Sequence, residues 1–425
     1  MPAFQTPRGL RDLLPPRSEE FERVIRESED LFRRFGYRRI ETPAFEYSEV
    51  FERGLEETSE MIVKETYKFK DRAGRSMTLR PDGTTPVMRA VLQHNLTRTG
   101  APVKLYYTAP MFRYEKPQAH RYRQHTQLGV EAVGSDSPSV DAEVIRLGAA
   151  VYENVGLPAP LLRLNSIGHP GCRADYLPKL GEFLEKNRER LCADCQRKIE
   201  SNPLRTFDCK VPQDQEIMAS APLISDHLCD DCRSHFAAVQ DDLKELGVAF
   251  ELDPRLVRGL DYYTRTTFEF EAAGMGAQSS VGGGGRYDGL AELLGGPHLP
   301  GIGFGLGVDR IIEALERSGH EATEFLDVFV VSLGEDAARR ALPLTEEVRR
   351  AGISADLDFE GKAVKSQFRT ANRRGARLVV VIGERELAEG MLTVRDMTTG
   401  DESAVPADEL ITFLQGKAAL REDAH

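Results

Sequence analysis

The sequence predicts an α+β protein with an antiparallel sheet, flanking helices, an inserted helical subdomain and a C-terminal α/β unit. Strand-like apolar segments follow one another in the first part of the chain, mostly joined by hairpin-like turns. Such connections favour antiparallel pairing. A charged segment with two cysteine pairs interrupts these strands. After residue 321 apolar strands alternate with helical patterns, which is typical of a separate unit with a parallel sheet.

Length and composition set the class of protein. The chain has 425 residues, of which 40% are hydrophobic and 29% charged, as in soluble globular proteins with two or three cores. Its N-terminal segment has no apolar signal region, and no run approaches the roughly 18 apolar residues that a membrane span needs. We therefore expect a cytoplasmic protein with no membrane partner. The formal net charge of −12 disfavours general nucleic-acid binding, so any RNA contact should be local.

The predicted elements follow in chain order. Apolar residues recur at near-helical spacing from Ser18, which we interpret as a helix cap, to Gly36. A short strand, YRRIETP, comes next. Further strands are predicted in SMTLRP, VKLYYTAPMFRYE, RQHTQLGVEAVG, RTTFEFEA and GIGFGLGV. We place the first domain at 1–323 with an insertion at about 172–249, and the second at 326–425, where DVFVVSL, ISADLD and LVVVIG are strands separated by helices.

Four of the six cysteines form two C-x-x-C pairs, Cys192 with Cys195 and Cys229 with Cys232. Paired C-x-x-C motifs can hold a structural zinc ion. The 33 residues between the pairs exceed the separation in a compact zinc ribbon, and Cys209 lies between them. The spacing leaves open a structural zinc or free thiols in a small insertion, and it favours free thiols.

Two glycine-rich segments predict a binding surface on the sheet. SSVGGGGRYDGL, residues 279–290, lies between a strand pattern and an amphipathic segment, so a flexible linker is disfavoured. The sequence contains neither a P-loop nor a Rossmann glycine motif. In PGIGFGLGVDR, four glycines alternate from Gly301 to Gly307, and the strand period of two places them on one face. Because glycine in a sheet marks close approach, we expect a floor on which a flat ring could lie.

Charged and polar side chains gather in two further segments. In MFRYEKPQAHRYRQHTQLGVEAVG, two strand-like arms carry Arg113, Glu115, Arg121, Arg123, Gln127 and Glu131. Paired charges on a solvated hairpin are the ordinary alternative. However, Arg113 follows an apolar segment, and Gln127 and Glu131 lie where other charges are few, so we expect these three to point inward. In LVRGLDYYTRTTFEF, Arg258 and two tyrosines precede a strand.

Together these segments resemble the histidyl-tRNA synthetase family of class II aminoacyl-tRNA synthetases over essentially the whole chain. RGLDYYTRTTFEF and SSVGGGGRYDGL resemble the two histidine-specific signatures of that family. FRYEKPQAHRYRQ resembles class motif 2, GIGFGLGVDR resembles motif 3, and the first helix with IETP resembles motif 1. The resemblance implies an antiparallel catalytic sheet, a variable insertion, a C-terminal α/β anticodon-binding domain and a homodimer joined through motif 1.

The resemblance implies a histidine–tRNA ligase that activates L-histidine with ATP and transfers it to the 3′ end of histidine tRNA. Positioning and charge neutralisation dominate such phosphoryl transfer, and guanidinium groups suit both tasks. By resemblance, Arg113 and Arg258 are catalytic: Arg113 would hold the α-phosphate, and Arg258 that phosphate and the histidine carboxylate. Glu115 and Arg310 would also bind ATP, with Arg310 at the γ-phosphate. Mg²⁺ would be held mainly by ATP, and no protein ligand for a metal is implied.

The resemblance also implies how histidine is recognised. The implied contacts are Asp82, Thr84 and Gln127 at the ammonium group, and Glu131, Tyr263 and the neighbouring Tyr262 at the imidazole. A site that pairs a polar group can reject analogues lacking it by roughly ten-thousandfold. The GGGG run would be the pocket floor, with Arg286 and Tyr287 at its edge. Bacterial members usually read TLRPEGT, whereas this chain reads TLRPDGT, so the shorter Asp82 implies a longer or water-bridged contact.

RNA contacts are implied at two places. Gln118 and Arg123 match family positions that read the acceptor end of histidine tRNA. In addition, GKAVKSQFRTANRRGAR, residues 361–377, has six basic residues and no acidic one. Helical spacing would align Lys362, Lys365, Arg369 and Arg373 beside an apolar stripe of Val364, Phe368 and Ala371 that can pack on the sheet. The alternative is a solvated basic face without an RNA partner.

A second function stays open, because the same catalytic fold serves as a non-catalytic regulatory subunit in histidine biosynthesis. Those proteins typically lack the anticodon domain and parts of the catalytic set. This chain has Arg113, Glu131, Arg258 and Arg310, followed by about 100 residues of α/β pattern. The sequence therefore favours the synthetase.

Overall fold

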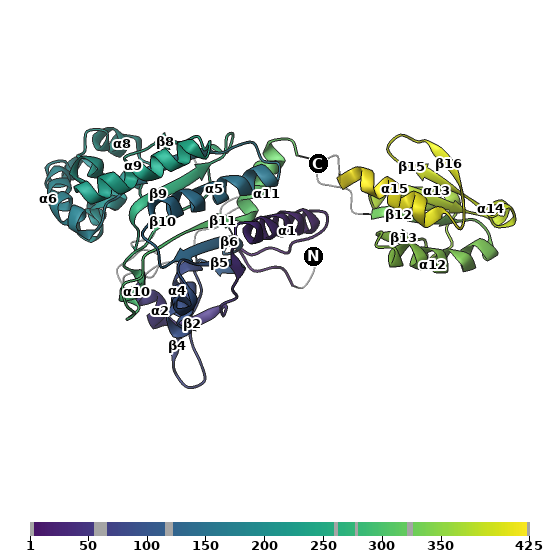
Figure 1. Cartoon of the computed structure of the whole chain (residues 1–425), viewed down its shortest axis with the longest axis horizontal. Helices are drawn as coiled ribbons and strands as arrows, with labels where there is room; N and C mark the ends of the chain where they lie inside the picture. The colour runs from purple at the N-terminus through teal and green to yellow at the C-terminus, as the bar shows by residue number, and fades with distance from the viewer. Residues whose placement is uncertain are drawn as a thin grey trace. The chain divides into compact units, whose positions relative to one another are not determined.

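The computed structural model describes residues 4–54, 66–114, 122–258, 262–276, 279–320 and 326–422, with side chains up to residue 417. The chain divides into two compact units, Met1–Glu321 and Ala322–His425 (Figure 1). Within the described residues, no helix combines the length and apolarity needed to cross a membrane.

The first unit is built on an eight-stranded sheet. In spatial order its strands are β1 (Arg38–Arg39), β5 (Val103–Phe112), β6 (Gln124–Val133), β11 (Gly301–Gly307), β10 (Ser280–Arg286), β9 (Thr264–Glu271), β7 (Leu161–Ser166) and β8 (Glu251–Leu252). Neighbouring strands are antiparallel except at the two edges, where β1 runs parallel to β5 and β8 to β7. The predicted antiparallel sheet is confirmed.

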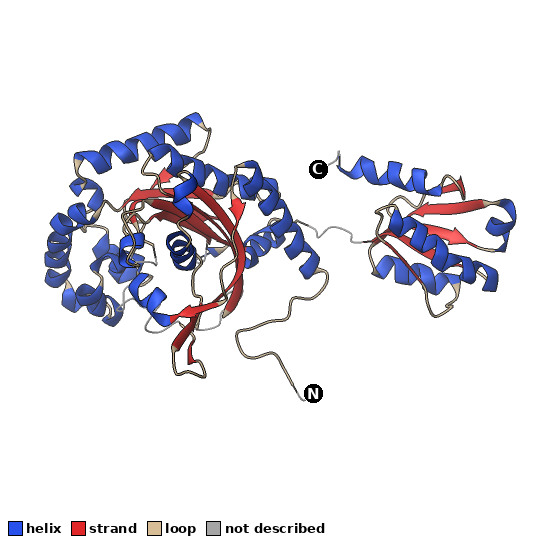
Figure 2. Ribbon diagram, turned by 60° about the horizontal axis from the view of Figure 1, so that its bottom comes forward, coloured by secondary structure: helices blue, strands red, loops and turns tan. Residues whose placement is uncertain are grey.

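One face of this sheet is covered by α1 (Arg17–Arg34), α5 (Pro138–Asn154) and α11 (Val308–Arg317), and Figure 2 shows the strands in red among the helices. Phe32 of α1, Val130 of β6 and Phe304 of β11 belong to the large apolar core between these layers. The prediction that Ser18 caps this helix is wrong. The helix begins one residue earlier, after Pro16, and the Ser18 hydroxyl donates to its neighbour Glu19.

Smaller elements cover the opposite face. They are α4 (Thr84–Gln93), α2 (Ser48–Gly54), α10 (Leu290–Leu293), the 3₁₀ turn η1 (Leu96–Thr99) and a three-stranded sheet of β2 (Phe45–Tyr47), β4 (Ser76–Leu79) and β3 (Lys68–Lys70). The segment SMTLRP thus forms a strand as expected, but in the small sheet rather than the main one. Val87 and Met88 of α4 pack with Tyr107 of β5 in a second core.

The insertion connects β7 with β8 and is entirely helical among its described elements. It consists of α6 (Pro170–Lys186), η2 (Arg188–Arg190), α7 (Ala193–Ser201), η3 (Pro203–Asp208), α8 (Pro212–Met218), η4 (Ile224–His227) and α9 (Asp230–Glu245). Figure 1 shows α6, α8 and α9 together at one end of the unit. A small core of its own contains Tyr176, Leu180 and Leu184, and α9 packs against α5 of the main fold.

The second unit is an α/β sheet in the order β13-β12-β14-β15-β16. Its elements are β12 (Leu326–Ser332), α12 (Glu335–Arg350), β13 (Ala355–Leu357), α13 (Val364–Arg373), β14 (Ala376–Ile382), α14 (Glu384–Glu389), β15 (Met391–Asp396), β16 (Glu402–Pro406) and α15 (Leu410–Glu422). The first three strands are parallel, as predicted, whereas β15 and β16 are antiparallel. The connection between β15 and β16 turns at Gly400 and is too short for a helical crossover.

Candidate active site

The candidate site lies on the sheet face opposite α1, α5 and α11. Along β6, Leu128 and Val130 point into the core, so Gln127 and Glu131 lie on the other face. The strand register places Gln127 opposite Gly307 and Glu131 opposite Gly303 of β11, and Gly305 of β11 opposite Gly283 of β10. On one side, the polar side chains of β6 are therefore followed by two strands, β11 and β10, that present glycines on this face.

The glycines make room for the side chains of the site itself. A methyl group at Gly303 would overlap Oε2 of Glu131, and one at Gly305 would overlap Nε2 of Gln127. On β10, a Cβ at Gly285 would lie 2.8 Å from the Tyr263 ring, and one at Gly283 3.1 Å from Cζ of Arg258. The glycine floor expected for a flat ligand is thus partly covered by polar and aromatic groups that face the pocket.

These groups enclose a pocket of about 170 Å³. Its lining residues are Asp82, Thr84, Arg113, His125, Gln127, Arg258, Tyr262, Tyr263, Gly283, Tyr287, Gly303, Phe304, Gly305 and Gly307. The segments that supply them are far apart in the sequence and meet only through the sheet. The fold therefore brings the predicted residues of TLRPDGT, motif 2 and the two histidine signatures into one cavity.

Glu131 is completely buried and does not itself line the pocket, but it is hydrogen-bonded to two residues that do, Thr84 and Tyr287. The Thr84 hydroxyl donates to its Oε1 at 2.7 Å, and the Tyr287 hydroxyl donates to its Oε2. Burial raises the pKa of Glu131 to about 8, against the opposing effect of these two donors. The two donors hold Glu131 in one orientation, while its burial favours the protonated carboxyl. Thr84, predicted as a contact of the ammonium group, lines the pocket, and its hydroxyl donates to Glu131.

Asp82 and Gln127 provide oxygen atoms on another side of the cavity. Asp82 is 3% exposed, and it accepts hydrogen bonds from the backbone N–H and the hydroxyl of Thr85 at 2.8 and 3.1 Å. Burial raises the pKa of the Asp82 carboxyl despite these donors. The buried Oε1 of Gln127 has no hydrogen-bond partner within the described part of the chain. An acceptor without a donor in a buried pocket is a ready contact for a ligand N–H group.

Two guanidinium groups supply positive charge to the same cavity. Arg113 is oriented by its Nε, which donates to the carbonyl of Pro81 at 2.9 Å. Arg258 forms an ion pair through Nη1 with Glu269 of β9. Burial acts to lower the pKa of Arg258, but the Glu269 carboxylate raises it above the ordinary value. The sequence interpretation missed Glu269, although its alternation with Phe268 and Phe270 in TTFEFEA could have placed it on the pocket face.

Other predicted residues lie outside the pocket lining. Arg310, in the first turn of α11 beyond Gly307, pairs with Glu313 at 2.6 Å. The Arg123 guanidinium lies over the Tyr114 ring, 4.0 Å from its centroid. Glu115 and Gln118 lie outside the described residues. His125 lines the pocket but was not predicted as a site residue.

The expected place of Arg286 at the pocket edge is wrong. Its side chain has no exposed surface and pairs with Asp141 of α5 and with Asp288. Because Gly285 faces the pocket, the next residue along the strand points to the helix-covered face. The neighbouring Tyr287, by contrast, does line the pocket.

The two C-x-x-C pairs do not meet in one site. Cys192 and Cys195 group with Cys209 and Asp214, whereas Cys229 and Cys232 group with His169 and Cys172. The two pairs therefore do not supply ligand atoms to one common site. Each pair begins a different helix, α7 or α9, and finds its partners locally in the fold.

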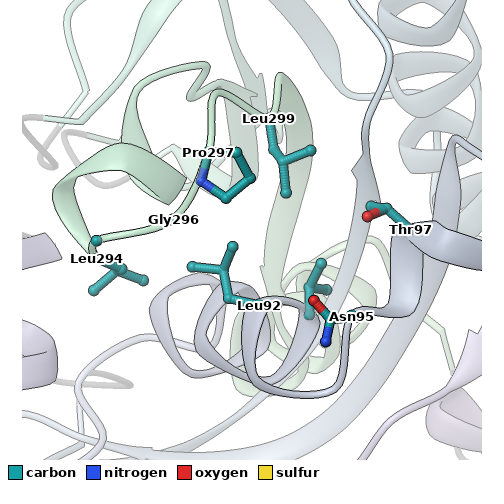
Figure 3. Close-up of a pocket in the computed structure, with 9 residues that line it drawn as sticks. Leu92, Asn95, Thr97, Leu294, Gly296, Pro297 and Leu299 are labelled. Carbon is teal, nitrogen blue, oxygen red and sulfur yellow. The ribbon is translucent and has the colours of Figure 1, made fainter.

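A second hollow of about 290 Å³ lies where the end of α4 and η1 meet the segment after α10 (Figure 3). Its lining residues are Val91, Leu92, Asn95, Thr97, Leu294, Gly295, Gly296, Pro297 and Leu299. These residues include no charged side chain. Although this hollow is larger, it lacks groups that could neutralise a phosphate or carboxylate, so the charged pocket is the candidate active site.

Comparison with known proteins agrees with this geometry. Residues 9–311 match the family model described as histidyl-tRNA synthetase, and residues 327–417 match the model described as anticodon binding domain. A histidine–tRNA ligase of Halothermothrix orenii is 45% identical over 97% of this chain and 99% of its own length. One of Moorella thermoacetica is 48% identical, with coverages of 96% and 97%.

A solved structure is similar as well. The crystal structure of apo S. aureus histidyl-tRNA synthetase has a TM-score of 0.78 and 37% identity, and the match covers 97% of this chain and 99% of that one. An antiparallel sheet with a charged pocket, followed by an anticodon-binding unit, defines an aminoacyl-tRNA synthetase, which is an enzyme. The chain belongs to the histidyl-tRNA synthetase family.

Proposed function

We propose that the chain is a histidine–tRNA ligase. A histidine carboxylate oxygen attacks the α-phosphorus of ATP, diphosphate leaves, and the histidyl group then passes from AMP to the 3′ ribose of histidine tRNA. The observation that carries the proposal is the charge arrangement of one pocket. Arg113 and Arg258 supply positive charge, Gln127 supplies an unpaired acceptor, and the buried carboxyl of Glu131 lies directly behind the lining residues Thr84 and Tyr287.

Each part of histidine has a chemically matched group in this pocket. Glu131 is placed to hydrogen-bond the imidazole, because it is buried and oriented by Thr84 and Tyr287. Gln127 and Asp82 offer oxygen atoms to the ammonium group. The shorter Asp82 is held by Thr85, so we assign its contact to a longer reach or a bridging water. Tyr263 and Tyr262 form the wall next to the imidazole.

The phosphates of ATP require cations. Arg113 is assigned to the α-phosphate, and Arg258 to the α-phosphate and the histidine carboxylate. Both residues line the pocket, and guanidinium groups bind such oxygens in pairs. Arg310 is assigned to the γ-phosphate from its place beyond the pocket end. Mg²⁺ would enter with ATP and neutralise its phosphates.

The regulatory-subunit alternative is not favoured. Arg113 and Arg258 both line the pocket, and an α/β unit that matches an anticodon-binding model follows it. The test is charging of histidine tRNA by the full chain with labelled histidine, ATP and Mg²⁺. A ligase forms histidyl-tRNA, whereas a regulatory subunit binds histidine without forming it. We further propose that the ligase acts in the cytoplasm as a homodimer, which light scattering would detect as twice the chain mass.

Histidine binding should be strongest between about pH 6.5 and pH 8. The pKa of Glu131 is about 8 in the ligand-free protein, and that of free imidazole is about 6.5. Between these pH values the Glu131 carboxyl is protonated and the free imidazole is neutral, so the two groups together carry one proton. A hydrogen bond between a carboxyl and an imidazole also contains one proton, so none has to be gained or lost on binding. Below pH 6.5 a proton must be released on binding, and above pH 8 one must be taken up, so affinity falls on both sides.

Calorimetric titration with histidine in buffers of different ionisation enthalpy measures both affinity and proton exchange. We expect no net proton exchange inside the window. The variant Glu131→Gln should bind more weakly and lose the decline on the alkaline side that comes from Glu131. An affinity that keeps rising through pH 8 in the unmodified protein contradicts the assignment of Glu131 to the imidazole.

Alanine at a glycine of the pocket face, Gly305, and at a glycine of the opposite face, Gly284, should separate histidine binding from folding. In Gly305→Ala the new methyl group meets only the flexible end of Gln127, so the fold should be kept while histidine binding weakens by roughly tenfold or more. In Gly284→Ala the methyl group meets the backbone carbonyl of Gly303, so the sheet itself must shift. That variant should lose about 2 kcal/mol of unfolding free energy.

Thermal unfolding and histidine titration of both variants make the comparison. The two changes have the same chemistry and lie on adjacent strands, so each is the control for the other. Unaltered histidine binding by Gly305→Ala would remove Gln127 from the proposed ammonium site.

A further inference from the structure

All six cysteines of the chain lie in or at the start of the helical insertion, in two groups of three. The first group consists of Cys172, Cys229, Cys232 and the ring of His169. The second group consists of Cys192, Cys195, Cys209 and the carboxylate of Asp214. Within each group the four ligand atoms lie within 4.8 Å of one another. Ligands of a tetrahedral zinc–sulfur site lie about 3.8 Å apart, since Zn–S distances are about 2.3 Å.

The first group joins the entrance and the exit of the insertion. His169 and Cys172 lie at the start of α6, directly after β7, whereas Cys229 and Cys232 begin α9. The N–H of Cys229 donates to Sγ of Cys172 at 3.3 Å across 57 residues of sequence, and the N–H of Cys232 donates to Sγ of Cys229 at 3.5 Å. Backbone N–H groups directed at sulfur stabilise the thiolate form that binds zinc.

The second group lies inside the insertion. Cys192 caps α7, and its Sγ lies 3.9 Å from Sγ of Cys209 and accepts from the N–H of Cys195 at 3.4 Å. Asp214 is completely buried, with its Oδ2 3.3 Å from Sγ of Cys209. Among the described residues no salt bridge reaches Asp214. The N–H of Cys192 donates to both oxygens of Asp214, at 3.1 and 3.2 Å. A carboxylate fixed beside three sulfur atoms is a ligand set that suits a dication.

We propose that each group binds one zinc ion, so that the chain carries two structural zinc sites. Four protein ligands fill each coordination shell, which is the arrangement of structural rather than catalytic zinc. A disulfide in either group would leave its third sulfur and its histidine or aspartate unused. The insertion is composed of short helices around a small core, and small folds commonly need such cross-links.

The first zinc site is connected to the histidine pocket. Arg173, next to Cys172, donates from Nη1 to the carbonyl of Tyr263 at 3.2 Å. Gly168, next to His169, accepts from the N–H of Arg265 at 2.8 Å. Removal of the first ion should therefore raise the KM for histidine, whereas removal of the second should act on the insertion. This consequence rests on the proposed function, but the metal content does not.

The test is the zinc content of the full chain purified without chelator and without added metal, measured by plasma mass spectrometry. We expect two zinc ions per chain in the unmodified protein. Cys232→Ser and Cys195→Ser should each retain one, and the double variant none. The matched controls His227→Ala and Asp226→Asn change residues of the same insertion outside both groups, and they should retain two.

Several results would overturn the proposal. One is a folded, metal-free protein with six titratable thiols. Another is an unmodified protein with only one ion per chain, which either cysteine change removes. The others are iron in place of zinc, and zinc that the cysteine changes do not remove. If a variant fails to fold, cobalt exchange into the unmodified protein gives an independent reading. Two cobalt ions per chain with tetrahedral, thiolate-bound spectra support the sites, and octahedral spectra without thiolate bands contradict them.

Discussion

Replacing Arg258 by alanine should lower the rate of histidine-dependent ATP–pyrophosphate exchange by about a hundredfold to a thousandfold. ATP affinity should change by a much smaller factor. Arg258 lines the pocket, and Glu269 keeps it charged and oriented. Its proposed task is to neutralise charge that develops at the α-phosphate as the carboxylate attacks. A group that acts on developing charge affects the rate more than ground-state binding.

The matched variant for Arg258→Ala is Glu269→Gln. It keeps the guanidinium group in the pocket but weakens the ion pair that orients it, so the rate should fall by a smaller factor. Exchange kinetics at saturating histidine, together with equilibrium titration of ATP, separate the two quantities. Equal losses of rate and ATP affinity in Arg258→Ala would contradict its proposed role.

A chain that ends at Glu321 should keep histidine-dependent exchange within about tenfold, whereas its charging of tRNA should fall by more than about a hundredfold. The pocket lies wholly in the first compact unit, and the second unit matches an anticodon-binding model. On α13 of the second unit, Lys365, Arg369 and Arg373 are exposed, while Ala371 packs in the core. These basic groups are suited to RNA phosphates, which position the tRNA without reading its bases.

A charge variant tests the same surface in the full chain. Alanine at Lys365, Arg369 and Arg373 together should weaken tRNA binding and reduce its salt dependence by roughly 0.7 log unit per lost phosphate contact. The control is the triple alanine variant of three exposed arginines of α12, Arg339, Arg340 and Arg350. Each of these arginines pairs with an acidic residue of the same helix. Full charging efficiency by the truncated chain would show that the second unit does not bind the anticodon stem as proposed.

The sheet could be predicted from the sequence because its strands carry a local signal. In β6 and β11 apolar residues alternate with polar residues or glycine, and this period of two determines which face each side chain occupies. The apolar stripe of the basic helix was also predicted, and Val364, Phe368 and Ala371 do pack in one cluster. Elements with a weaker signal were missed, as in the antiparallel hairpin of β15 and β16.

Contacts between distant segments could not be predicted in the same way. The bond from Thr84 to Glu131 and the ion pair of Arg258 with Glu269 depend on strand register and loop position, which no local pattern encodes. The cysteine groups show the same limit. Spacing identified the C-x-x-C pairs, but His169 and Asp214 complete their groups only in the folded insertion.

ATP–pyrophosphate exchange, measured in turn with each standard amino acid, tests most directly whether the pocket activates histidine. We predict exchange with histidine and none above background with the others, because Glu131, which is buried and oriented by Thr84, is the group proposed to pair with one imidazole nitrogen. The assay needs folded full-length protein, ATP and Mg²⁺. Absence of exchange with histidine under these conditions, or equal exchange with several amino acids, would contradict the proposed ligase activity.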